Sequence, residues 1–115
     1  ARSLLDAGAV ISGASDWFVS SPNPFHAMYQ AETRRGPKGV LDASQRMPRE
    51  AMLYAYTRNA ARAMNRLDQI GSIEPGKKAD LTLVDSDVLT LPVEDLKKVK
   101  VVWTMAGGKQ VYLAR

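Results

Sequence analysis

The chain has 115 residues, of which 45% are hydrophobic, a share typical of a globular protein with one core. It contains no cysteine, which excludes disulfide scaffolds, cysteine-ligated zinc and thiol nucleophiles. A single histidine, His26, excludes a histidine-rich metal site built from this chain alone, and the net charge of +4 permits binding to phosphate or anionic membranes without requiring it.

The first residues indicate an α/β unit. Residues 3–7 are predicted to form a short helix that ends at Gly8, and residues 9–13 a brief strand. This apolar run lacks the alternation of a half-exposed strand, so we expect a buried strand of the kind found in parallel sheets. Because the chain opens on Ala1 instead of an initiator methionine, and residues 1–8 look like the middle of a helix that runs into its glycine stop, we also expect an upstream segment in the natural protein.

Two longer helices are predicted next. The first spans residues 25–35, follows a turn-rich segment at 20–24 and ends at Gly36-Pro37, after which residues 39–47 are predicted to form a loop. The second is predicted as one continuous helix over residues 48–65, with Pro48 at its first position. Its basic stripe is expected to face solvent.

From Gly71 onward the pattern changes to β structure. We predict a turn at 71–76, strands at 79–85, 99–105 and 109–113, and a short helix at 92–97. Gly107-Gly108 is predicted to be a two-residue hairpin turn, because both positions tolerate positive φ. The chain thus divides into an α/β piece, residues 1–68, and a β-rich piece, residues 69–115.

Residues 71–77 match the start of the phosphate-binding motif G-x-x-x-x-G-K-[ST], but Lys78 stands where the motif needs a hydroxyl. The predicted helix precedes this segment and the predicted strand follows it, which is the reverse of the order that lets helix-end amides hold phosphate. We therefore interpret residues 71–76 as a plain turn.

Asp16 is the carboxylate best placed for chemistry, because it follows directly after the predicted buried strand. Residues at the carboxyl ends of strands line the sites of α/β folds, so an acid here can serve as a general base or hold a metal. The alternative is a structural Asx-turn or helix cap. His26 has no second histidine or cysteine as a metal partner, and we interpret it as a partly exposed structural residue.

Two blocks of the sequence carry a resemblance. The first comprises residues 7–10, Ser15-Asp16-Trp17, 22–25 and 33–35, and the second comprises 51–52, 56–57, 59–61, the stretch Ile-Gly-Ser-Ile-Glu-Pro-Gly-Lys-Lys-Ala-Asp-Leu at 70–81, and 102–112. In order and spacing they resemble the C-terminal end of the amidohydrolase superfamily, and more narrowly the branch that includes N-substituted formamide deformylases. Nearly the whole chain is covered.

This resemblance implies a fold much larger than the chain: a (β/α)8 barrel plus a small composite β-sandwich. Residues 1–68 would be the C-terminal end of the barrel, with its last strand and helices, and residues 69–115 part of the sandwich; taken alone, the chain would be classed as α+β. Asp16 matches the aspartate after the eighth strand, which in the superfamily contacts the metal and shuttles a proton from water to the leaving nitrogen. Ser15 and Trp17 would lie beside the substrate pocket.

The resemblance also implies a function. The parent would be a metal-dependent hydrolase, with zinc as the expected divalent metal, acting on carbon–nitrogen bonds other than peptide bonds in an amide or cyclic amide. The superfamily's other metal ligands have no counterpart here, so we expect the 115 residues alone to bind no metal and to be inactive.

The expected partners are a small-molecule amide-like substrate and the remainder of the same chain, with neither nucleic acid nor membrane; a homo-oligomer is left open. The sequence shows no spanning segment and no signal-peptide pattern, so the expected location is the cytoplasm unless an export signal lies upstream.

Two other interpretations stay open from the sequence. The chain could be a free-standing, non-catalytic α+β module that binds a partner or self-associates through exposed β edges at 81–84 and 101–105. It could also be a small basic nucleic-acid binder, whose affinity would fall steeply with salt.

Overall fold

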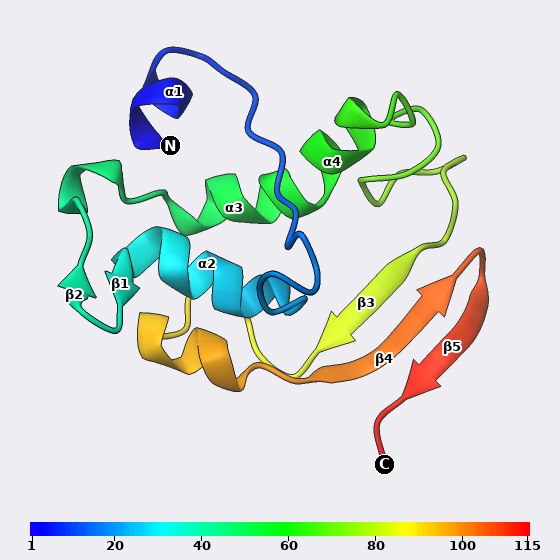
Figure 1. Cartoon of the computed structure of the whole chain (residues 1–115). Helices are drawn as coiled ribbons and strands as arrows, with labels where there is room; N and C mark the ends of the chain where they lie inside the picture. The colour runs from blue at the N-terminus through cyan, green and yellow to red at the C-terminus, as the bar shows by residue number, and fades with distance from the viewer.

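The computed structural model describes residues 1–115 and mixes helices with a small sheet (Figure 1). The first half contains helices α1 (Arg2–Asp6), α2 (Pro24–Thr33), α3 (Arg49–Tyr56) and α4 (Arg58–Ala63), the short hairpin strands β1 (Arg35–Gly36) and β2 (Gly39–Val40), and the 3-10 helix η1 (Ala43–Gln45). The second half contains strand β3 (Leu81–Val84), the 3-10 helix η2 (Val93–Lys98), and strands β4 (Val101–Ala106) and β5 (Lys109–Leu113). None of the helices combines the length and apolarity that a membrane span requires.

A small apolar core joins the two halves. Met28 and Tyr29 of α2 are buried with Leu96 of η2, and partly buried side chains from α3 and from residues 88–93 pack around them. Figure 1 shows α3 and η2 on opposite sides of α2. The two pieces divided at residues 68 and 69 therefore share this core, and the domain boundary itself stays a prediction.

Arg49 ties these layers together from the start of α3. Its Nε and Nη2 atoms donate to the two carboxylate oxygens of Glu32 on α2, at 2.7 and 3.0 Å. Its Nη1 atom donates to the carbonyl oxygens of Val88 and Leu91, at 3.2 and 2.5 Å. One side chain thus links α2, α3 and the segment that leads into η2.

The predicted strand at 9–13 is wrong for this chain, because the segment pairs with no strand. It runs along the helices instead: the Gly13 amide donates to the Ala55 carbonyl at 3.0 Å, and the Asn59 side chain donates to the Ile11 carbonyl at 2.9 Å. A strand needs a neighbouring strand to pair with. The sheet of this chain lies apart from the segment (Figure 1), and the two hydrogen bonds to helix groups satisfy part of the segment's backbone instead.

The predicted helix at 48–65 is broken, and the predicted loop at 39–47 contains β2 and η1. The break lies at Thr57, whose φ of −120° and ψ of −99° are not helical. Its hydroxyl donates to the Leu53 carbonyl at 2.8 Å, a side-chain bond that competes with the regular helical ladder. Pro48 precedes α3 as its N-cap residue and is not its first helical residue.

The sheet is antiparallel with strand order β3-β4-β5. The Gly107-Gly108 turn is confirmed: Ala106 pairs with Lys109, and the two glycines have φ of 56° and 80°. The prediction of an exposed edge at 101–105 is wrong, because β4 is the central strand, with β3 on one side and β5 on the other. The two edges are therefore β3 and β5, and β5 is exposed along its whole length.

Candidate functional site

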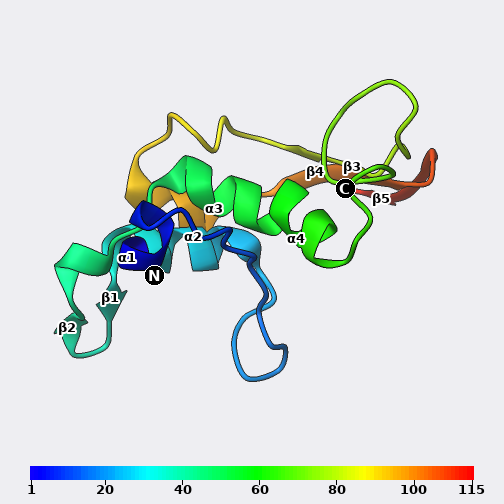
Figure 2. The same ribbon diagram turned by 90° about the horizontal axis from the view of Figure 1, so that it is seen from above.

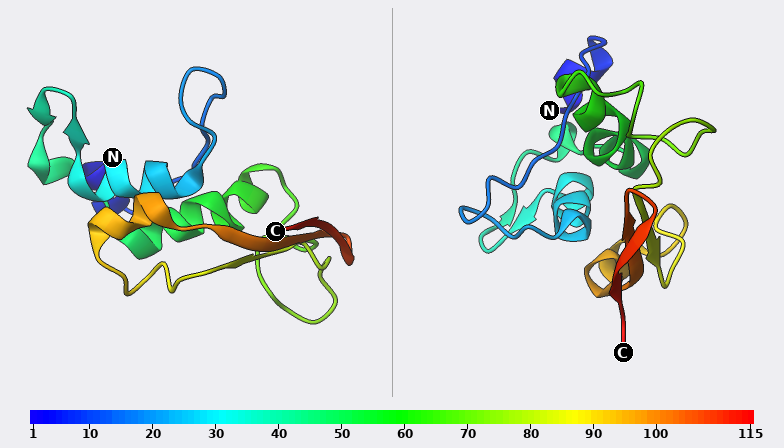
Figure 3. Two further views of the ribbon diagram at one scale, coloured as in Figure 1. Left: turned by 90° about the horizontal axis from the view of Figure 1, so that it is seen from below. Right: turned by 90° about the vertical axis from the view of Figure 1, so that its right-hand side faces the viewer.

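Residues 14–23 form a loop that projects away from the helices (Figures 2 and 3). Its first end is held by the bond from Gly13 to Ala55, and at its second end the Asn23 side chain caps α2 by accepting from the Phe25 amide at 2.9 Å. Inside the loop, the Val19 amide donates to the Asp16 carbonyl at 2.8 Å, and the Ser20 hydroxyl donates to the Ser15 carbonyl. The loop is thus anchored at both ends and braced internally.

Asp16 lies in this loop, and its carboxylate has no hydrogen-bond partner in the chain. Its backbone is left-handed, with φ of 51°, and its main-chain carbonyl makes the turn with Val19. The side chain is exposed and takes part in no hydrogen bond or ion pair within the chain. The Asx-turn alternative therefore fails, since the turn is made by the backbone, and the carboxylate stays free to accept a proton or bind a ligand.

The two other predicted site residues flank Asp16 on the same loop. Ser15 is half-buried, and its carbonyl is engaged by Ser20. Trp17 is 68% exposed and packs edge-to-face on Phe18, with ring centroids 6.4 Å apart. Trp17, Phe18 and Val19 together present three large apolar side chains to the surroundings. The structure thus gathers Ser15, Asp16 and Trp17 in one loop without enclosing them in a pocket.

The residues that hold the loop were missed by the sequence reasoning. Gly13 lies so close to the ring of Tyr56 that a methyl group in place of its hydrogen would lie 2.7 Å from the ring Cε2 atom. Burial raises the pKa of this Tyr56 hydroxyl. A glycine at the end of an apolar extended segment is itself a signal of close backbone approach, and it could have pointed to this contact.

An open groove lies between α1, residues 9–11 and the α3–α4 pair. Its volume is about 380 Å³, and its lining includes Leu5, Val10, Tyr54, Arg58 and Asn59. The Arg58 guanidinium lies 3.9 Å from the centre of the Tyr54 ring, a cation–π contact. Asp16 does not line this groove, so the groove and the candidate catalytic carboxylate are separate features.

The chain does not assemble a metal centre. Nowhere do three histidine, cysteine or carboxylate side chains come close enough to hold a metal ion. Zinc sites in proteins use at least three protein ligands, and Asp16 can supply one. The residues of this chain alone therefore do not fit a catalytic metal.

In the segment that resembles a phosphate-binding loop, the polar side chains bond to one another. The Lys77 ammonium donates to the Ser72 hydroxyl at 2.6 Å and lies 3.3 Å from a Glu74 carboxylate oxygen. The Ser72 hydroxyl bonded to Glu74, and then Lys77, lower the pKa of that carboxyl. With α4 before this segment and β3 after it, the interpretation as a turn is confirmed. His26 lies half-buried in the first turn of α2.

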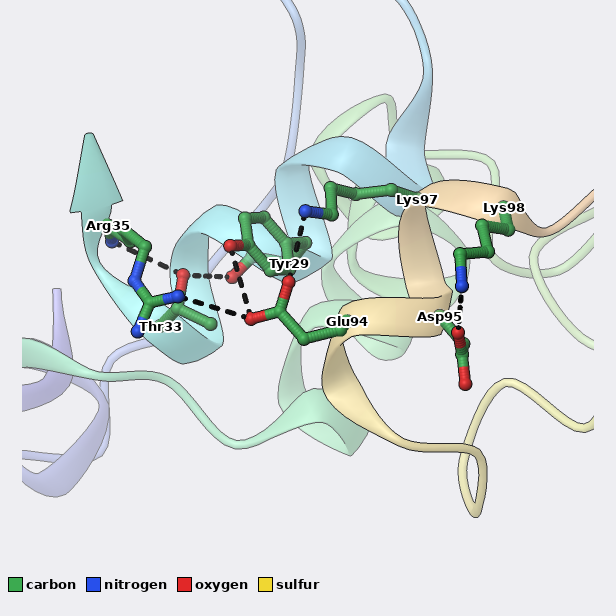
Figure 4. Close-up of polar contacts among 7 residues, drawn as sticks. All are labelled: Tyr29, Thr33, Arg35, Glu94, Asp95, Lys97 and Lys98. Carbon is green, nitrogen blue, oxygen red and sulfur yellow. Dashed lines mark hydrogen bonds and ion pairs between the residues drawn. The ribbon is translucent and has the colours of Figure 1, made fainter. Parts of the chain in front are cut away.

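A second polar cluster joins the β1–β2 hairpin to η2 (Figure 4). Glu94 accepts from Lys97 at 3.0 Å, from the Tyr29 hydroxyl at 3.4 Å and from Arg35 at 3.4 Å. The Lys97 hydrogen bond is the main reason that the pKa of Glu94 is lowered, and the same bond raises the pKa of Lys97. The Lys97 ammonium also lies 4.3 Å from the centre of the Tyr29 ring. Every member has a partner in the chain, so we interpret the cluster as structural.

The chain is similar to one family model and to several known proteins. A family model described as "Amidohydrolase family" matches residues 1–112. An N-substituted formamide deformylase from Arthrobacter pascens is 34% identical over 108 residues, which is 93% of this chain and 20% of that protein. An imidazolonepropionase from Geobacillus sp. is 42% identical over 85 residues, 74% of this chain and 18% of that protein. The protein LONG AFTER FAR-RED 3 from Arabidopsis thaliana is 34% identical over 96% of this chain and 19% of its own length.

A solved structure agrees with these sequence relatives. The amidohydrolase from Thermotoga maritima MSB8 superposes with a TM-score of 0.67 and 30% identity, over 96% of this chain and 25% of that one. The chain thus spans about a fifth to a quarter of the length of these relatives. The family match along nearly its whole length, together with this shared fold, shows that the chain belongs to the amidohydrolase family.

Proposed function

We propose that the chain is the C-terminal portion of a metal-dependent hydrolase that cleaves carbon–nitrogen bonds other than peptide bonds. The observation that carries this proposal is the family match over residues 1–112. Two of the relatives are named for the formamide and imidazolone substrates on which such enzymes act, and this supports an amide or cyclic amide as the substrate class.

In this proposal residues 1–68 complete a (β/α)8 barrel and residues 69–115 part of a β-sandwich. The extended apolar segment 9–13 would be the last barrel strand, paired with strands from elsewhere in the parent. The absence of a strand partner within the chain fits this proposal, because residues 9–13 lie outside every helix and pair with no strand here. The exposed edges β3 and β5 would likewise be covered by further sandwich strands.

Asp16 is the proposed catalytic residue. Its free carboxylate would accept a proton from the attacking water and return it to the leaving nitrogen, as a general base and then a general acid. A divalent metal, zinc in this proposal, would be held mainly by residues outside these 115, with Asp16 as one contact, and would supply the acidified water. Ser15 and Trp17 would border the substrate. Without the other ligands, the 115 residues alone would be inactive.

The test uses the full-length protein loaded with Zn²⁺ and two probes, an N-alkylformamide and a cyclic amide, with amine release or ring opening as the readout. Asp16→Asn should lower kcat by about 10²- to 10⁴-fold. Asp68→Asn, at an exposed carboxylate outside every ion pair of the chain, is the matched control and should keep normal turnover. Chelation should abolish turnover and added Zn²⁺ should restore it. Near-normal turnover of Asp16→Asn with metal still bound would refute the proton-transfer role.

The alternative is a free-standing, non-catalytic α+β module. The exposed edge strand β5, with Val111 and Leu113 63% and 59% exposed, favours self-association or partner binding. The mass of the protein made by its source cell, detected with an antibody against this segment, separates the two functions. A species several times heavier than the chain supports the hydrolase, whereas a species of 115 residues supports the module.

A further inference from the structure

The segment that leads into Asp16 is fixed on the break between α3 and α4. The Asn59 side-chain amide donates to the Ile11 carbonyl at 2.9 Å, and the Gly13 amide donates to the Ala55 carbonyl at 3.0 Å. Ala55 is fully buried, so its carbonyl needs a partner inside the protein. These two bonds come from either side of the break at Thr57 and hold alternate residues of the segment.

A close contact adds to these bonds. A Cβ atom at Gly13 would lie 2.7 and 2.8 Å from two atoms of the Tyr56 ring, a separation that real Cβ atoms do not adopt. The glycine permits this close approach, and a side chain here would force either the segment or the Tyr56 ring to move. Asp16 follows only three residues later, so a shift of Gly13 is passed along the backbone to its carboxylate.

We propose that Asn59 is a positioning residue for Asp16, acting through its hydrogen bond to Ile11 and together with the Gly13 contact. The inference rests on the proposed function, in which Asp16 transfers the proton. The bond requires a donor at position 59, because a carbonyl oxygen can only accept. Its loss would free the segment 9–13 to slide on α3 and α4, and a misplacement of about 1 Å is enough to lower turnover up to about 100-fold.

The first experiment measures position directly by hydrogen–deuterium exchange of the full-length protein. Asn59→Leu removes the donor at similar size and should speed exchange in peptides covering 9–19, while peptides covering β4 and β5 stay unchanged. Arg62→Leu, an exposed change one turn further along α4, is the matched control and should leave both regions unchanged.

The second experiment measures turnover of the two amide probes by the same variants. Asn59→Leu should lower kcat by about 10- to 100-fold, with KM changed less than about three-fold. In the Asp16→Asn background, Asn59→Leu should cause no further loss, because both changes remove the same function. Gly13→Ala should also lower kcat, and Tyr56→Leu combined with it should recover much of the loss by removing the ring that the methyl group meets.

The outcomes separate this inference from the proposed function. Normal turnover and unchanged exchange in Asn59→Leu, beside an inactive Asp16→Asn, would overturn the positioning role and leave the proposed function standing. Multiplying losses in the double variant would also overturn it, because Asn59 would then act on the fold as a whole. Full turnover of Asp16→Asn would overturn the proposed function and this inference with it.

Discussion

Replacing Arg49 with methionine should destabilise the chain more than any change to its exposed arginines. Arg49 makes a two-pronged ion pair with Glu32, at 2.7 and 3.0 Å, and donates to two carbonyls of the segment before η2. The Arg49 and Glu32 side chains are 12% and 31% exposed. Methionine fills the space of the aliphatic stem but leaves the carboxylate and both carbonyls without their donor.

The size of the effect follows from that burial. Breaking a fully buried ion pair by removing one partner costs about 3–5 kcal/mol, and water that reaches the partly exposed Glu32 reduces this to about 2–3 kcal/mol. Arg49→Lys keeps the positive charge but loses the planar guanidinium that binds both carboxylate oxygens, and it should lower the free energy of unfolding by about 1 kcal/mol. Urea unfolding followed by circular dichroism should show the midpoint of Arg49→Met lowered by about 1–2 M.

The matched control is Arg66→Met, at an exposed arginine whose side chain makes no ion pair in the chain. It should change the free energy of unfolding by less than about 0.5 kcal/mol. If Arg49→Met cost no more than this control, the contacts of Arg49 would not stabilise the packing of α2, α3 and the segment before η2.

Three further outcomes are expected. The pKa of Glu94 is lowered in the folded chain, so the stabilisation by this carboxylate is present above the usual carboxyl pKa and is lost as the pH falls through the folded pKa. The urea midpoint of Glu94→Gln should therefore fall less between about pH 6 and about pH 3 than the urea midpoint of the unsubstituted chain. Gly71→Ala should cost clearly more than Gly76→Ala in urea unfolding. Both glycines have positive φ, 94° and 92°, but a methyl group at Gly71 would lie 2.5 Å from a carbon of α4, whereas at Gly76 it would meet open space. Any self-association of the 115-residue chain should weaken in Val111→Lys, because a charge on the exposed edge strand opposes pairing; analytical ultracentrifugation showing an unchanged association constant would exclude β5 as the contact.

Elements governed by local chemistry were predicted well from the sequence. The Gly107-Gly108 hairpin, the stop of the first helix at Gly8 and the turn at 71–76 depend on positive φ at glycine, which a sequence displays directly. The break at Thr57 was not predictable in the same way. The helical pattern continues through it, and the break depends on a side-chain bond to Leu53 that competes with the regular backbone bonds.

The candidate site likewise has features that depend on local sequence and features that depend on distant contacts. A site at Ser15-Asp16-Trp17 was proposed because this stretch carries a family resemblance and follows an apolar run, and in the structure these consecutive residues lie in one braced loop. Whether Asp16 is catalytic stays a prediction. The supports of the loop were missed because they join residues more than 40 positions apart, as with Asn59 and Ile11. Such pairings depend on how α4 is turned relative to the segment, which no local pattern encodes.

The wrong strand at 9–13 and the exposed edges of the sheet have one explanation under the proposed function. The sequence of residues 9–13 is apolar as a buried strand requires, yet Val10 is 51% exposed; β5, an edge strand, carries apolar Val111 and Leu113 and is exposed throughout. Just 7 of the 115 residues are buried, although 45% of the residues are hydrophobic, so most hydrophobic side chains stay at least partly exposed. The hydrophobic pattern of a segment matches the burial of that segment in the complete protein. In a parent about five times longer, as the relatives are, strands from the rest of the chain would cover these segments, and the prediction of a buried strand at 9–13 would hold there.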